Sequence, residues 1–151
     1  MKRFEFRYEP LLRKRKHLED LLKQQVAEVF SRMAPKQARL EQLDRQWHAV
    51  QRNLLDPTGL PPAQLALHDH QLRSIADEQQ LLNTELRKLE QELALVRQKL
   101  TLAHQDFKIM ERFKERKLET HLAAAAAEET REFDEIAVVR KARSRSEEEA
   151  Q

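Results

Sequence analysis

The chain has 151 residues, of which 36% are charged and 5% aromatic, and it contains one glycine and no cysteine. So few turn-forming residues exclude a compact fold with many chain reversals, and the lack of cysteine excludes a disulfide framework and a thiolate metal site. The net charge of +2 is too small to indicate an acidic or a basic partner by itself.

Residues 1–9 are expected to be extended, because Phe4, Phe6 and Tyr8 alternate with charged residues. Residues 1–16 hold seven Lys or Arg against two Glu. No apolar stretch follows this basic start, so we expect no secretory signal, and no stretch approaches the ~18 apolar residues of a membrane-spanning helix. Pro10 suits the first position of a helix, where its missing N–H costs no hydrogen bond.

Apolar and long side chains at steps of three and four predict a first helix over residues 10–54. The positions of this pattern are Leu11, Arg15, Leu18, Leu22, Val26, Val29, Met33, Lys36, Leu40, Leu43, Trp47, Val50 and Leu54. Two consecutive steps of four, from Leu18 to Val26, predict a stutter that locally relaxes the supercoil. Pro35 removes one backbone hydrogen bond and predicts a kink, because the spacing resumes in phase after it.

Residues 55–62 hold the glycine and three of the five prolines, and they predict a turn. A second helix without Gly or Pro is expected over residues 63–141, followed by a frayed charged tail at 142–151. Its apolar positions are Leu72, Ile75, Leu82, Leu86, Leu89, Leu93, Val96, Leu100, Ala103, Phe107 and Met110. Their mean spacing of about 3.5 residues is that of a coiled-coil seam.

The predicted fold is therefore all-α: one domain formed by a long antiparallel two-helix coiled coil, an α-hairpin whose second helix is longer than the first. Folding about residue 58 places Pro10 beside roughly Asp106 and leaves the end of the second helix unpaired. That end includes five consecutive alanines, Ala123–Ala127. Alanine stabilises a lone helix but provides almost no side chain for a two-stranded seam.

Candidate chemical groups are sparse. His68, Asp69 and His70 could begin a metal site, but residues two apart on a helix point to different faces, so we interpret them as surface side chains. No Gly-rich phosphate loop is present. The sequence therefore predicts no enzyme, no catalytic, metal or cofactor-binding residue, and no cofactor.

The basic run at residues 13–16 resembles a nucleic-acid patch, but four consecutive residues point all round a helix. Protein contact or simple solvation are the other interpretations, and we expect no nucleic-acid partner. Trp47 lies on the seam, where core packing is the simpler interpretation and a partner anchor near the hairpin tip is the alternative.

Three segments resemble the FliJ proteins of bacterial flagellar export. They are the opening at residues 1–15, the stretch at 86–117, and the segment Phe133-Asp134-Glu135-Ile136-Ala137-Val138-Val139-Arg140 near the end. The resemblance implies a central stalk, similar to the gamma subunit of rotary ATPases, which enters and stimulates the hexameric FliI-type export ATPase. It also implies contact with the FlhA-type export gate, with export chaperones and with a FliH-type ATPase regulator.

The same resemblance implies a cytoplasmic protein, peripheral to the inner-membrane export apparatus and not inserted in the membrane. Candidate contacts with the ATPase ring are Arg13, Lys14, Arg112, Lys114, Arg116, Lys117, Asp134, Glu135, Arg140 and Lys141. Candidate contacts with the gate are Leu43, Trp47, Val50 and Leu72. The alternatives are a stalk protein of a type III injectisome, an escort chaperone for export substrates, a nucleic-acid-binding coiled coil and a self-assembling rod.

Overall fold

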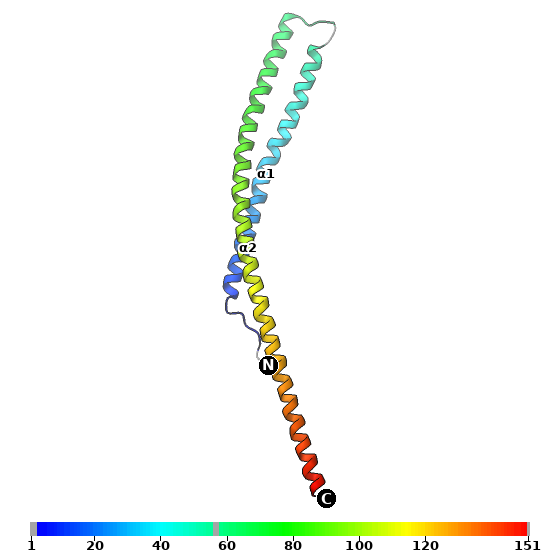
Figure 1. Ribbon diagram of the computed structural model, residues 1–151. Coiled ribbons are helices and arrows are strands. Elements are labelled where there is room, and N and C mark those ends of the chain that lie inside the picture. Colours follow the sequence, from blue (N-terminus) through cyan, green and yellow to red (C-terminus); the bar gives the residue numbers. More distant parts are fainter. Residues whose placement is uncertain (1–2, 56–57, 151) are drawn as a thin grey trace. The chain divides into compact units, whose positions relative to one another are not determined.

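A computed structural model describes residues 3–55 and 58–150 of the chain (Figure 1). Helix α1 covers Glu9–Leu54 and helix α2 covers Pro62–Glu149. The described residues include no strand, and the two helices pack against each other. The predicted all-α fold, a two-helix coiled coil with a longer second helix, is confirmed.

The ends of the helices follow from local backbone chemistry. The Glu9 N–H donates to the Phe6 carbonyl over 3.1 Å, which starts α1 one residue before Pro10. Gly59 has a φ of 73°, a left-handed conformation that glycine adopts without steric cost. The Pro61 carbonyl then accepts the N–H groups of Gln64 and Leu65 at the start of α2. Asp56 and Pro57, which belong to the predicted turn, lie outside the described residues.

The second helix was expected to end at residue 141, whereas α2 continues to Glu149; the expected fraying of the tail stays a prediction. Ser144 and Ser146 each donate a hydroxyl hydrogen bond to the carbonyl three residues earlier, and both residues lie within the helix. Arg, Glu and Ala, which make up most of this segment, are good helix formers. A charged segment without a seam can thus remain helical through propensity alone.

Contacts divide the chain into two compact units. The hairpin unit comprises His17–Ala103, and the terminal unit comprises Met1–Lys16 and His104–Gln151. Each helix contributes to both units. The expectation of a single domain stays a prediction.

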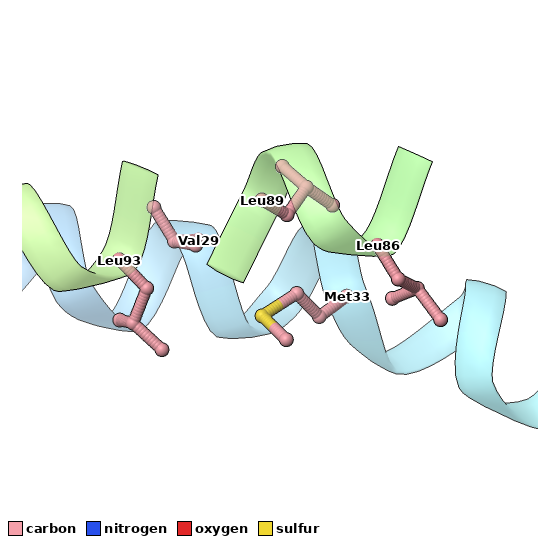
Figure 2. Packing of buried hydrophobic residues seen from close by; sticks show 5 residues of the cluster. All are labelled: Val29, Met33, Leu86, Leu89 and Leu93. Atoms are coloured by element: carbon pink, nitrogen blue, oxygen red, sulfur yellow. The ribbon is translucent and has the colours of Figure 1, made fainter. Parts of the chain in front are cut away.

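The core of the hairpin unit lies between α1 and α2, which run side by side there (Figure 1). Figure 2 shows its central cluster, in which Val29 and Met33 of α1 meet Leu86, Leu89 and Leu93 of α2. All five side chains are at most 8% exposed. Burying such a side chain contributes about 1.5–3 kcal/mol, so this seam is the main source of the unit's stability.

The seam of α1 is more regular than the sequence predicted. Leu18 is 50% exposed, whereas its neighbour Glu19 is 2% exposed. Leu12 is likewise buried and Leu11 is exposed. The predicted stutter is therefore wrong: steps of three and four run without interruption when the seam passes through Leu12 and Glu19. Continuity of the heptad outweighs the cost of placing one carboxylate in the seam, and Lys23 pairs with that carboxylate at 2.9 Å.

Pro35 does not split α1, which is continuous through this position. Its ring is exposed, so the carbonyl that loses an N–H partner one turn earlier can be hydrated. The kink predicted there stays a prediction.

The pairing in the terminal unit differs from the expected register. The Arg15 guanidinium donates to the Asp106 carbonyl at 2.9 Å, and Lys114 forms an ion pair with Glu9 at 2.7 Å. Placing Pro10 beside Asp106 was therefore wrong by more than one helical turn. These two contacts place the midpoint of the pairing at about residue 61, later than residue 58, because residue 15 pairs with residue 106 and residue 9 pairs with residue 114.

Candidate protein-binding surfaces

The N-terminal segment Arg3–Tyr8 packs on α2 through its aromatic residues. Phe6 and Tyr8 lie 5.8 and 5.9 Å from Phe113, measured between ring centroids, and Phe4 lies 5.5 Å from His121. Tilted and edge-to-face arrangements at these distances are favourable for aromatic rings. The segment thus covers α2 beyond the point where α1 begins. Because aromatic and charged residues alternate, as predicted, the aromatic side chains can contact α2 while the charged ones face solvent.

The charged residues of this segment stay in solvent while Phe4 and Phe6 are half-buried. Together with α2 they border a groove of about 680 Å³. Its lining includes Arg3, Arg7 and Lys117, and the Lys117 ammonium lies 5.4 Å from the centroid of the Phe113 ring. The groove is therefore aromatic inside and basic at its rim.

The ten predicted ring-contact residues all belong to the terminal unit. Nine are exposed, namely Arg13, Lys14, Arg112, Arg116, Lys117, Asp134, Glu135, Arg140 and Lys141. Lys114 is half-buried because it pairs with Glu9. Nine of the ten charges are thus accessible to another protein.

Within the terminal unit, no other described segment lies beside the end of α2, which is the orange and red part of the ribbon (Figure 1). Ala125 is 8% exposed, but every residue from Ala126 to Ala150 is exposed. The last two alanines of the run, Ala126 and Ala127, begin this stretch. As a helix the stretch has a length of about 36 Å. Apolar side chains on it are also exposed, among them Phe133 at 70% and Val138 at 67%.

The four predicted gate contacts lie in the hairpin unit and are covered to different degrees. Leu43 is 1% exposed, whereas Trp47, Val50 and Leu72 are half-buried. Leu43 therefore presents no surface to a partner while the helices are paired. Its place in the seam was visible in the sequence spacing.

Exposed leucines near the turn were missed by the sequence reasoning. Leu55 is 81% exposed, Leu67 is 55% exposed and Leu65 is 44% exposed. Two of these residues, Leu55 and Leu67, fall outside the three-and-four spacing that predicts burial. An apolar residue out of phase with the seam, next to a turn, was the signal that could have identified them.

At least three ion pairs join α1 and α2 across the seam in the described part of the hairpin unit. Arg39 forms two hydrogen bonds with the Glu78 carboxylate, at 2.7 and 3.0 Å, which lower the pKa of Glu78 and raise that of Arg39. The others are Lys36–Glu85 at 2.6 Å and Arg32–Glu92 at 2.5 Å. Because these side chains are partly solvated, each ion pair contributes little to the stability of the unit.

Two of the residues considered as metal ligands, His68 and Asp69, contact other side chains. His68 shares a 3.3 Å hydrogen bond with Gln71, and Asp69 pairs with Arg73 at 2.8 Å. No group of three or more His, Asp or Glu side chains that could hold a metal ion occurs among residues 3–55 and 58–150. Within the same residues, neither helix has a stretch apolar enough to cross a membrane.

Comparison with known proteins identifies a family. The family model described as the flagellar FliJ protein matches residues 4–146, nearly the whole chain. No curated protein and no solved structure matches.

Proposed function

The chain belongs to the FliJ family of flagellar export proteins, and on that premise we propose that it is the central stalk of a FliI-type hexameric export ATPase. The carrying observation is the end of α2, a helix exposed on all sides from Ala126 to Glu149. A single helix with side chains is about 10–12 Å wide, a size suited to the pore of a protein ring. The chain would regulate hydrolysis while the ATPase supplies the catalytic residues.

The composition of this end fits insertion. Ala123–Ala127 narrows the helix and stabilises it without a packing partner, since alanine has the highest helix propensity. Beyond it the exposed charges have both signs, with Asp134 and Glu135 followed by Arg140 and Lys141. Such charges would orient the stalk and raise the rate of association with a complementary ring more than the affinity.

The N-terminal segment would limit how deep the stalk enters. Up to His121 the aromatic contacts of Phe4, Phe6 and Tyr8 add a second chain to α2, so the stalk is thicker there. Arg13, Arg112 and Arg116 lie on this thicker part and are exposed. They would meet the rim of the ring, whereas the residues after Ala125 would occupy its pore.

The hairpin unit would carry the contact with the FlhA-type export gate. Trp47, Val50 and Leu72 are partly accessible there, and Leu55 and Leu67 add exposed apolar surface near the turn. Binding at this end would place the protein at the cytoplasmic face of the export apparatus. A FliH-type regulator would act on the same ATPase.

A second function, as an escort for export chaperones, is favoured by a separate observation. Leu81, Leu95 and Leu102 are at least 60% exposed on the side of α2 that faces away from α1. Their spacing of fourteen and seven residues places them on one stripe of the helix. An amphipathic helix of a chaperone could pack along it.

ATP hydrolysis by the cognate ATPase, measured with and without the chain, tests the stalk. We expect the intact chain to increase the rate and Ala127→Pro to abolish most of the increase, because proline breaks the exposed helix. Ala127→Ser is the control, since it changes the same site without removing a backbone N–H. Circular dichroism should show the hairpin unit unfolding at the same temperature in both variants. No stimulation by the intact chain would contradict the stalk function.

A further inference from the structure

One face at the end of α2 has an order of side chains that is complementary to itself. A single shallow surface is lined by Glu132, Glu135, Ile136, Val139, Arg140 and Arg143. The row formed by Glu132, Ile136, Val139 and Arg143 within it is called the C-terminal face. They follow one another at steps of four, three and four residues, the spacing of a coiled-coil seam. Ile136 and Val139 are 49% and 50% exposed.

Along the helix, the C-terminal face presents an acidic side chain, two apolar side chains and a basic side chain, in that order. Against a second copy running in the opposite direction, Glu132 meets Arg143 and Ile136 meets Val139. All four positions are then matched by one two-fold axis between Ala137 and Val138. Such a surface fits an isologous dimer, in which both subunits use the same patch.

The charges of this face cannot satisfy each other within one chain. Glu132 and Arg143 are eleven residues apart on the same helix, or about 16 Å along its axis. A parallel partner would place Glu132 against Glu132 and Arg143 against Arg143, which is repulsive. The antiparallel arrangement instead brings the two opposite charges of this row together and also buries its two apolar residues.

We propose that the C-terminal face binds the same face of a second copy of this chain, forming an antiparallel helix pair centred between Ala137 and Val138. Phe133, which is 70% exposed, lies at the edge of the pair, where the Arg140 guanidinium of the second copy can stack on its ring. The interface has two apolar layers, far below the ~1,200 Å² of a standard interface, so the dimer is weak and reversible. This pairing does not rest on the proposed contact with the ATPase.

Sedimentation equilibrium of the full chain alone tests the pairing. We expect the mean mass to rise from 18.0 kDa towards twice that value as the concentration increases about a hundredfold. Arg143→Glu should abolish the rise, because Glu132 then faces a second carboxylate. The double variant Glu132→Arg with Arg143→Glu should restore it, because it exchanges the two charges and keeps them complementary.

A mean mass of 18.0 kDa at every concentration would overturn the proposal and leave the C-terminal face to a different protein. Association that survives Arg143→Glu would also overturn it, because another surface would then be responsible. Failure of the ATPase test would leave these measurements unchanged, so the two proposals fail separately.

Cysteine cross-linking locates the interface, since the chain has no cysteine of its own. Mixed with the Ile136→Cys variant, Val139→Cys should form a disulfide-linked dimer under mild oxidation, because Ile136 and Val139 face each other across the proposed pair. Val138→Cys is the matched control: Val138 is more exposed, at 67% against 50%, but it does not line the C-terminal face. Equal rates of cross-linking for the two variants would contradict the assigned face.

Discussion

Helix α2 has two different surroundings along its length. In the hairpin unit it lies beside α1, and Leu86, Leu89 and Leu93 are buried between the helices. From Ala126 to Ala150 every residue is exposed. The comparison separates two sources of helix stability: packing of an apolar stripe in the first part, and the intrinsic propensity of Ala, Glu and Arg in the second.

The largest effect is expected from the same substitution made in the hairpin unit and in the terminal unit, where Leu122 lies just before the exposed stretch. Leu89→Ala should lower the free energy of unfolding by about 2–5 kcal/mol, because it leaves a cavity in the central cluster. Leu122→Ala, at a position 50% exposed, should change it by less than about 0.5 kcal/mol. Urea unfolding followed by circular dichroism measures both. Equal losses would mean that the two parts of α2 do not differ as described.

A smaller effect, of opposite sign, is expected at Glu19, the buried charged residue of the seam. Glu19→Leu should raise the free energy of unfolding by about 1 kcal/mol, because a buried ion pair replaced by an apolar side chain is often stabilising. Lys23→Met should lower it, since the buried carboxylate loses the ammonium 2.9 Å away. The same urea titration distinguishes them. A loss of stability in Glu19→Leu would show that the carboxylate stabilises the seam.

Much of the fold was predictable because the apolar spacing and the single break specify a helical hairpin. The register between α1 and α2 was not predictable. Glu78, Glu85 and Glu92 are spaced seven residues apart, so sliding α2 by one heptad would still place Glu78 beside Lys36 and Glu85 beside Arg32. The apolar seam also repeats after seven residues. Neither pattern distinguishes neighbouring registers.

Local errors arose where apolar residues lie next to the true seam. Leu18 was chosen over Glu19 because hydrophobicity was the only signal available, whereas the folded helix keeps its heptad in phase. The surfaces that bind partners were less predictable than the core. In the sequence, Leu43 has the spacing of a buried seam residue and also lies where a contact with the gate was expected. Its exposed fraction of 1% in the structure assigns it to the seam.

The smallest expected effect is a pH dependence of the stability of the paired part of α2. Hydrogen bonds from Arg39 lower the pKa of Glu78 below its ordinary value of 4.5, so the stabilisation from this pair is present above about pH 4.5 and is lost as the pH falls through the lowered pKa. Glu78→Gln should therefore melt at a lower temperature than the native chain near pH 7, and the difference should shrink below about pH 4. Both groups are 39% exposed, which keeps the difference small. Glu90→Gln, at an exposed acid on the same helix, is the control for losing one negative charge. If the difference between Glu78→Gln and the native chain persisted at low pH, the Glu78 side chain would act through packing, and the pairing of α1 with α2 at this position would not depend on its charge.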